Sequence, residues 1–494
     1  MPEPGKFHVT TPLYHASSRP NIGHAYTALA ADVLTRHLRA GGREVFFRTG
    51  ADAHAAGVAG TARARGAAPG DWADGVSADF ERAWKLLNIG YDSFLRTTDP
   101  EHARRVRDAF GKLLASGDIY PGACSGPYCA ACGSFYDVGA LRGDGLCPVH
   151  RTRMEKVSGD AYFFRLSRYA RPLLRHYAAN PAFLAPARRA AEMAALVKNG
   201  LEDIPVARTG VGWGIPVSSD PEHTVQAWFG ALLAHITGAG WEADRPAPGF
   251  ARLWPADLHL ADAESFRLHA TAWPAILLAL GLPLPRRIYA HGGWRIEGDG
   301  MSGTGGDAIS PSDIIKEYGA DALRYFLFRE TPFGQDGDFS AEAFRRRYNA
   351  DLAGDLGGLF SRVLGLADKY PENGLPNRPE EGPARNFARL RALEPRIAAD
   401  IEELNFSSAL DRIWGAVGEL NGCMGPEKRR EKERDPAAGA DLLKDMVWCL
   451  RLLAGWLYPF MPDTSARMQM IMSMGTTASG VEPQKAAPLF PVKD

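Results

Sequence analysis

Apolar and polar positions in the first 120 residues alternate between two periods, one typical of strands and one typical of helices. A short apolar run at Phe7–Leu13 is typical of a buried strand, and Ala25–Ala40 carries apolar residues at helical spacing. A second strand is indicated at Arg43–Thr49, and further helices at Trp72–Leu87 and Glu101–Ala115. Strands that alternate with helices predict an α/β fold with a parallel sheet, whose ligands bind at the carboxyl ends of the strands.

The second half of the chain has a different pattern. Helical periodicity runs from about residue 346 to 470 with short breaks, which predicts an all-α bundle. Turn signals at Gly334–Gly337 indicate a stem or linker before it, and residues from Ile471 to Asp494 have a loop-like composition.

The loop between the first strand and the first helix is the first candidate for chemistry. A helix N-terminus presents free backbone N–H groups and partial positive charge, which suit a triphosphate. Gly23 allows close approach of the backbone, and His24 can donate a hydrogen bond to a phosphate oxygen. An ordinary turn with Asn21 as a helix cap fits the same residues, so both interpretations stay open.

Composition sets limits on the class of protein. With 494 residues, 45% hydrophobic and 23% charged, the chain is expected to fold into roughly two to four globular modules. The formal net charge of −1 gives no general basic field for a nucleic acid. No run of about 18 apolar residues predicts a membrane span, and the start lacks a signal-peptide pattern, so a soluble cytoplasmic protein is expected.

Four residues have the types and spacing of a zinc site. Cys129 and Cys132 form one pair and Cys147 and His150 the other, separated by a glycine-rich stretch. Three thiolates and one imidazole are a standard structural zinc set, and a full set of protein ligands leaves no open position for catalysis. Cys124 is a spare candidate.

A family resemblance accounts for the whole pattern. Thr10–Tyr14 together with His24–Asp32 resembles the opening of the class I methionyl-tRNA synthetases, whose His-Ile-Gly-His signature is here Asn21-Ile22-Gly23-His24. The resemblance implies a Rossmann-like nucleotide-binding core with a zinc-binding insertion and a C-terminal α-helical bundle like the family's anticodon-binding domain. It implies this order: core, first half, 1–117; zinc insertion, 118–225; core, second half, 226–325; stem, 326–345; bundle, 346–470; tail, 471–494.

The resemblance also implies an amino-acid pocket. Asp52, after the second strand, matches the aspartate that holds the α-amino group in the family, and a carboxylate suits an ammonium ion. The other matching pocket positions are Leu13, His15, Trp228, Ala231, Leu232, His235, His269 and Trp273. His15 and His235 stand where the family has tyrosine. Since a thioether prefers an apolar wall, we hypothesise a substrate smaller or more polar than methionine. Core packing for the aromatic residues, and a surface position for the two histidines, stay open as alternatives.

The ATP site departs from the family pattern. The family's Gly-Lys-Asp becomes Asp262-Ala263-Glu264, and its Lys-Met-Ser-Lys-Ser loop becomes Gly300-Met301-Ser302-Gly303-Thr304, without either lysine. Losing one such preorganised donor commonly costs roughly 10²–10³ in rate. Backbone N–H groups of the glycines, or Arg19, could substitute, and a loop without a phosphate role is the alternative. The expected catalytic residues are Asn21, His24, Met301 and Ser302; the expected ATP-binding residues are Asn21, Gly23, His24, Asp262, Glu264, Gly300, Gly303 and Thr304.

The anticodon site is also altered. The family has a Pro-Trp pair whose indole stacks on an anticodon base, but the matching stretch from Asn421 to Arg430 has no tryptophan. Such stacking is worth about 1–3 kcal/mol per base, so its loss bears on tRNA reading.

These departures favour an enzyme repurposed from the family. It would activate an amino acid with ATP and Mg²⁺ and transfer it to a small nucleophile, such as an N-hydroxylated amine, toward N–N bond formation. It is similar in this to the synthetase-like half of hydrazine-forming enzymes, whose cupin half would here be a separate protein. Transfer to tRNA is not expected in that case. A genuine but divergent methionine–tRNA ligase and a catalytically dead amino-acid-binding protein are the alternatives.

Overall fold

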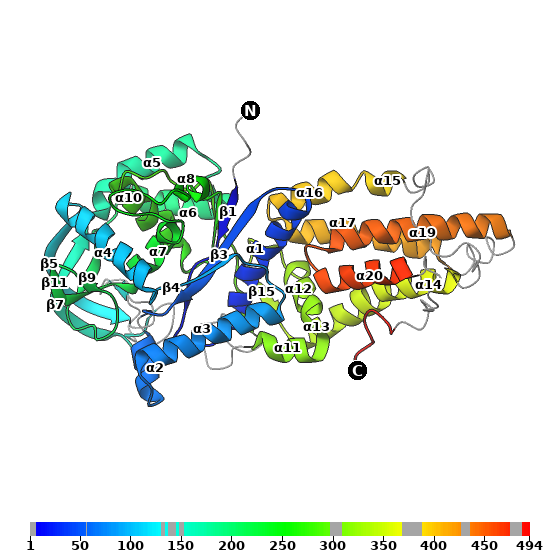
Figure 1. Ribbon diagram of the computed structural model, residues 1–494, viewed down its shortest axis with the longest axis horizontal. Helices are drawn as coiled ribbons and strands as arrows, with labels where there is room; N and C mark the ends of the chain where they lie inside the picture. The colour runs from blue at the N-terminus through cyan, green and yellow to red at the C-terminus, as the bar shows by residue number, and fades with distance from the viewer. Residues whose placement is uncertain are drawn as a thin grey trace.

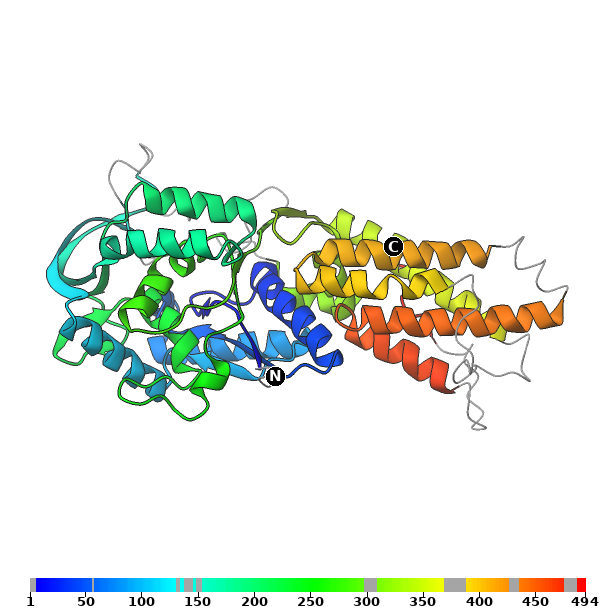
Figure 2. The ribbon, with the colours of Figure 1, turned by 90° about the horizontal axis from the view of Figure 1, so that it is seen from above.

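The chain folds into an α/β core with a helical arm. The computed structural model describes residues 6–55, 57–129, 134–136, 145–147, 153–296, 309–367, 388–425, 435–474 and 487–494, and all structural statements concern these residues. Figure 1 shows the α/β core at one end and the long helices α17 and α19 at the other, and the view from above in Figure 2 shows the same elongated arrangement. None of the helices in these ranges is long and apolar enough to cross a membrane.

A parallel sheet forms the centre of the core. Within the described residues its order is β2-β3-β1-β12-β13-β8, with β4 also paired to β3, and every pairing is parallel. Its strands are β1 (Phe7–Thr10), β2 (Tyr14–His15), β3 (Val45–Asp52), β4 (Ser93–Arg96), β8 (Leu184–Ala185), β12 (Leu258–Ala261) and β13 (Ile288–Ala290). The α/β fold with a parallel sheet is therefore confirmed.

Helices cover both faces of this sheet. One apolar cluster packs α1 and α3 against Val9 and Phe47 and continues into the helical arm. A second cluster lies on the opposite side, where α4, α7 and α10 pack around Phe229 and Trp273. The helices of the core are α1 (Ile22–Ala40), α2 (Gly57–Ala64), α3 (Pro69–Leu86), α4 (Pro100–Ala115), α7 (Ala227–Thr237), α8 (Phe250–Leu253), α9 (Phe266–Ala270) and α10 (Ala272–Ala279).

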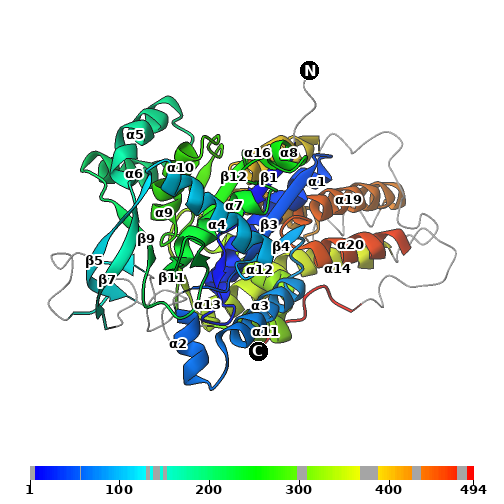
Figure 3. The same cartoon turned by 60° about the vertical axis from the view of Figure 1, so that its left-hand side comes forward.

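An antiparallel sheet occupies the predicted insertion. Its order is β10-β11-β9-β7-β5-β6 among the residues that the structure describes, and Figure 3 shows β5 and β7 on the side of the core away from α19 and α20. Its elements are β5 (Ile119–Cys129), β6 (Ser134–Phe135), β7 (Glu155–Phe164), η2 (Leu166–Tyr169), α5 (Ala170–Ala179), α6 (Ala187–Lys198), β9 (Ile204–Arg208), β10 (Pro216–Val217) and β11 (Asp220–Val225). Strand β8, from the middle of this stretch, pairs instead with β13 of the core.

The helical region follows a short stem. The stem elements are β14 (Trp294–Ile296), α11 (Pro311–Tyr318), α12 (Ala320–Arg329), β15 (Gly337–Phe339) and α13 (Ala341–Arg347). The bundle elements are η3 (Tyr348–Gly357), α14 (Gly358–Ala367), α15 (Ala388–Arg391), α16 (Glu394–Glu402), α17 (Phe406–Cys423), α19 (Pro436–Leu457) and α20 (Pro462–Met474). The expected helical region is thus observed, whereas the bounds of the six predicted segments stay a prediction.

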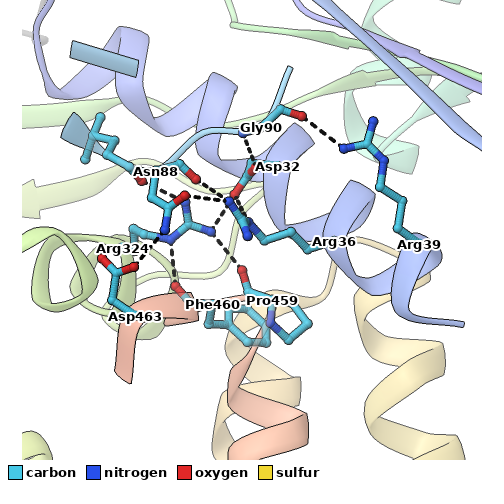
Figure 4. A network of polar contacts seen from close by, with 10 residues as sticks. Asp32, Arg36, Arg39, Asn88, Gly90, Arg324, Pro459, Phe460 and Asp463 are labelled. Atoms are coloured by element: carbon cyan, nitrogen blue, oxygen red, sulfur yellow. Dashed lines mark hydrogen bonds and ion pairs between the residues drawn. The ribbon is translucent and has the colours of Figure 1, made fainter. Parts of the chain in front are cut away.

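A buried ion pair joins the core to the helical region (Figure 4). Arg324 of α12 and Asp32 of α1 are both fully buried, and Arg324 Nη2 lies 2.6 Å from Asp32 Oδ2. The same guanidinium donates to the carbonyl oxygens of Leu87, Pro459 and Phe460. One side chain therefore connects α1, the end of α3, α12 and the segment that precedes α20.

Candidate functional site

The N-terminus of α1 is closed by a capping box. Asn21 Oδ1 accepts a hydrogen bond of 3.0 Å from the His24 N–H, and His24 Nδ1 accepts one of 3.4 Å from the Asn21 N–H. The capping role considered for Asn21 is therefore observed. Because Nδ1 of His24 is an acceptor, its Nε2 carries the proton. Burial lowers the pKa of His24 to about 4, so a neutral N–H donor stands at the helix terminus.

Asp52 ends β3 with one carboxylate oxygen unpaired. The residue is 1% exposed, and its Oδ1 accepts from the His54 N–H at 3.1 Å and from Thr97 Oγ1 at 3.2 Å. Its Oδ2 is buried and has no hydrogen-bond partner in the described structure. Burial, the largest cause, raises the pKa of Asp52. Such an oxygen could accept a hydrogen bond from a cationic donor, because a buried acceptor left unpaired costs free energy.

His15 lies beside Asp52. The parallel pairing of β2 with β3 sets His15 opposite Asp52, and the His15 side chain is exposed. A positive charge on His15 would favour the ionised form of the Asp52 carboxyl group.

Gly50 and Leu13 form a close contact near Asp52. A side-chain carbon at position 50 would stand 2.1 Å from the Leu95 carbonyl oxygen and 2.7 Å from a Leu13 methyl carbon, so only glycine fits. Leu13 is buried in a small cluster with Leu95 and Ala234, and Ala231 packs on it. This apolar cluster packs α7 against β4 and the segment that follows β1.

Three imidazoles meet between the sheet and α7. His235, His259 and His269 are at most 4% exposed, and the ring centroids of His235 and His259 are 4.2 Å apart. His269 Nδ1 lies 2.9 Å from the carbonyl oxygen of Ser265, so it must donate there, which leaves His269 Nε2 as an acceptor. His235 Nε2, at 3.1 Å, therefore carries a proton and donates to it.

The tautomer of His259 follows in the same way. The Trp273 Nε1–H can only donate, and it does so to His259 Nε2 at 3.2 Å. His259 Nδ1 therefore carries the proton and donates to Thr10 Oγ1 at 2.6 Å. Burial, with a further contribution from His269, lowers the pKa values of His235 and His259. The cluster is thus neutral at pH 7.

Several expected pocket residues are buried in the core or packed against it. Trp273 and Leu232 belong to the buried core between α7 and α10, as the core-packing alternative allowed, and Trp228 packs against this core. Of the two histidines, His235 is buried and His15 is exposed. The alternative of a surface position therefore does not hold for His235.

The turn after β12 contains Asp262 and Glu264, two of the residues expected to bind ATP. Asp262 Oδ1 accepts from the Ser265 N–H at 2.7 Å. Burial alone would raise the pKa of Asp262, but His291 and the hydrogen bonds from Ser265 together hold it below its ordinary value. Glu264 is exposed in the same turn. Asp262, which follows the carboxyl end of β12, therefore shapes this turn.

Other expected residues lie outside the described ranges. These are Gly300, Met301, Ser302, Gly303 and Thr304 of the signature loop, Cys132 and His150 of the zinc set, and residues 426–430 of the stretch that begins at Asn421. Cys129 and Cys147 are described and fully buried. Among the residues that the structure describes, no three histidine, cysteine or acidic side chains gather as metal ligands.

Sequence reasoning missed Arg48 and His259. Arg48 is 2% exposed on β3 and donates to the carbonyl oxygens of His235 and Gly238 at the end of α7. The available signal was a single arginine within the apolar strand Val45–Asp52.

Comparisons with known proteins agree on one family. The family model described as tRNA synthetases class I (M) matches residues 7–161 and 143–364. The chain is 39% identical to a methionine–tRNA ligase of Caldanaerobacter subterraneus, over 94% of this chain and 73% of the relative. It is 37% identical to a methionine–tRNA ligase of Streptomyces coelicolor, over 94% and 88% respectively. A crystal structure of Mycobacterium tuberculosis methionyl-tRNA synthetase bound by methionyl-adenylate superposes with a TM-score of 0.90 at 34% identity, covering 98% of this chain and all of that one.

Proposed function

Since the chain belongs to the methionyl-tRNA synthetase family of class I tRNA synthetases, we propose that it activates an amino acid with ATP and is a divergent methionine–tRNA ligase. Its relatives at 35–39% identity bear that name, and the match covers at least 93% of this chain in each. One structural observation carries the amino-acid part of the proposal. Asp52 Oδ2 is a buried carboxylate oxygen without a partner in the described residues, which suits a substrate ammonium group.

The remaining residues suit the two halves of the reaction. The His24 Nε2–H and the N-terminus of α1 would hold phosphate oxygens of ATP, with Mg²⁺ bound to the nucleotide as part of the substrate. The amino-acid carboxylate would attack the α-phosphorus and release pyrophosphate. An acceptor nucleophile would then attack the adenylated carboxyl carbon and release AMP.

A second candidate is the repurposed ligase with a small acceptor. The observation that favours it is the His235–His269 pair, because two hydrogen-bonding imidazoles suit a polar side chain better than a thioether. The sequence adds a signature loop without lysines and a bundle stretch without tryptophan. A hydroxylated amine as acceptor and a separate cupin partner belong to this candidate. The names of the relatives favour the first candidate, and a cytoplasmic location is proposed for both.

Structural zinc is part of either candidate. The donor set Cys129, Cys132, Cys147 and His150 fits tetrahedral zinc by residue type. In support, Cys129 and Cys147 are both fully buried, as metal thiolates in a structural site would be.

The decisive experiment measures ATP–pyrophosphate exchange with single amino acids. AMP release is then followed with methionine tRNA or with hydroxylamine as the acceptor. Exchange with methionine and tRNA-dependent AMP release would support the first candidate. Exchange with another amino acid, unaffected by tRNA, would support the second. No exchange with any amino acid would leave a binding protein and refute both.

Asp52→Asn tests the observation on which the proposal depends. We expect KM for the activating amino acid to rise roughly 10- to 100-fold, the cost of losing a hydrogen bond to a charged group, while KM for ATP stays within about twofold. The exposed Asp244→Asn is the matched control and should match the parent. Equal amino-acid KM values for Asp52→Asn and the parent would contradict the assignment of Asp52.

A further inference from the structure

Arg48 occupies an unusual place in the core. It is 2% exposed on β3, and no carboxylate within the described residues lies at ion-pair distance from it. Its Nη1 lies 3.5 Å from the His235 carbonyl oxygen, its Nη2 donates to the Gly238 carbonyl oxygen, and its Nε has no partner in the same ranges. These carbonyls belong to the last turn of α7, where unpaired C=O groups and the helix dipole give partial negative charge.

The location of Arg48 connects it to the amino-acid site. Side chains alternate along a strand, so Arg48, Gly50 and Asp52 lie on the same face of β3. Leu13 packs over Gly50, and Asp52 presents its unpaired oxygen at the end of the strand. The same face of β3 therefore carries Asp52, the proposed ammonium site, at its end and Arg48, which binds the last turn of α7, four residues earlier.

Arg48 contacts the backbone of His235, whose imidazole belongs to the histidine cluster. His235 contributes its carbonyl oxygen to Arg48 and its Nε2–H to His269. We propose that Arg48 is a positioning residue of the amino-acid site, which holds the last turn of α7 so that His235 keeps its hydrogen bond to His269. The inference rests on the proposed function, because that function makes His235 part of the substrate site.

Gly238 offers an independent way to disturb the same contact. A side-chain carbon at position 238 would stand 2.7 Å from Cζ and Nε of Arg48, so it must displace the guanidinium. The φ of Gly238 is −70°, which any residue adopts, so Gly238→Ala introduces no backbone strain.

Arg105 of α4 supplies a matched control. It donates to the carbonyl oxygen of Thr237, in the same turn of α7, at 2.8 Å, but it approaches from α4 and also pairs with Glu242 at 2.8 Å. Figure 3 shows α4 and α7 next to each other. Arg105→Met therefore removes a comparable contact to the same helix end without touching His235.

The first measurement needs no substrate. The ¹⁵N-imidazole spectrum of the free protein, assigned with His235→Asn and His269→Asn, reports the protonated Nε2 of His235 and the unprotonated Nε2 of His269. We expect both signals to shift in Arg48→Met and in Gly238→Ala, and to match the parent in Arg105→Met. Unchanged signals in both Arg48→Met and Gly238→Ala would overturn the proposal.

The second measurement is steady-state kinetics of pyrophosphate exchange. We expect KM for the activating amino acid to rise roughly tenfold in Arg48→Met and in Gly238→Ala, while KM for ATP is unchanged, because misplacement of a positioning group weakens only the contacts it sets. Arg48→Lys, which keeps one charged donor, should recover part of the loss. Adding Gly238→Ala to Arg48→Met should have little further effect, since the two changes remove one contact.

Two outcomes separate the inference from the function. If Arg105→Met raises the amino-acid KM as much as Arg48→Met, the effect is general loosening of α7 and the positioning role is wrong. If the parent protein activates no amino acid, the proposed function fails, and the imidazole spectra alone decide whether Arg48 sets the His235–His269 bond. Failure of Arg48→Met to fold would leave Gly238→Ala to decide both measurements.

Discussion

Arg48 and Arg324 are both buried arginines, but their charges are balanced in different ways. Arg324 is fully buried against Asp32, and three carbonyl oxygens take its other donors. Arg48 has no carboxylate partner in the described structure, is held by the carbonyl end of a helix, and burial lowers its pKa to about 10. The first arrangement suits a permanent joint between two regions. The second leaves a buried cation among neutral imidazoles, with no carboxylate at ion-pair distance in the described residues.

The comparison predicts that lowering the pH destabilises the folded protein through the histidines around Arg48. Burial lowers the pKa values of five histidines on this face of the sheet, those of His8 and His102 to about 3. The five are His8, His102, His235, His259 and His269. An unfolded chain would take up protons near pH 6.5 while the native one would not, so their stabilising contribution is complete above pH 6.5 and is lost as pH falls toward the native pKa values. The loss is about 1.4 kcal/mol per histidine per pH unit.

Urea unfolding at a series of pH values between 7.5 and 5 checks this prediction. The free energy of unfolding should fall steeply below pH 6.5. His102→Phe should make the fall shallower by about one proton, because one buried imidazole is removed. A free energy of unfolding that stays constant over this range would contradict the neutral cluster.

The ion pair can be broken at one partner or at both. Arg324→Met should lower the free energy of unfolding by about 3–4 kcal/mol, because the buried Asp32 keeps only Arg36 as a counterion and three backbone carbonyls lose a donor. Arg48→Met should lower it by only about 1–3 kcal/mol, because only backbone carbonyls lose a donor. Urea unfolding at pH 7.5 measures both variants.

The double variant Asp32→Leu with Arg324→Met sharpens the same contrast. It should regain part of the loss, since the buried carboxylate and guanidinium are both removed, while Arg36 keeps its hydrogen bonds to Asn88. Equal losses of unfolding free energy in Arg324→Met and Arg48→Met would mean that a carboxylate partner adds nothing to the stability contributed by a buried arginine.

The smallest effect is expected at the exposed edge of the Arg324 network. Asp463 Oδ1 accepts a hydrogen bond of 2.8 Å from Asn88 at the surface (Figure 4), and Asp463 lies in the first turn of α20. Asp463→Ala should cost about 1 kcal/mol, from the hydrogen bond and the helix dipole together. Asp463→Asn keeps an acceptor and should cost about half of that. Thermal unfolding of both variants would detect the difference.

Local pattern predicted the elements but not all of their ends. The first helix begins at Ile22 and not at Ala25, because Asn21 and His24 close its N-terminus reciprocally. Strand β3 extends to Asp52, beyond the expected Thr49, because β2 and β4 both pair with its last residues. The position of Asp52 at a strand end was therefore foreseen, while the pairing that fixes it required the folded sheet.

The buried charges could not be foreseen from the sequence. Asp32 and Arg324 are 292 positions apart, and nothing local to either residue indicates the other. Arg48 is an exception to its apolar strand, but its partners are backbone carbonyls at the end of a helix almost two hundred residues away. Backbone acceptors have no sequence signature, since every residue carries one.

The short strand β8 has a mechanical consequence. It arises midway through residues 118–225 yet pairs with β13 of the central sheet. The stretch is thus fastened to the core in its middle as well as at its two ends. Rotation about one end of this stretch therefore could not move the antiparallel sheet away from the core. Excising the stretch as a cassette would strip β13 of a neighbour and uncover a row of backbone donors and acceptors at the sheet edge.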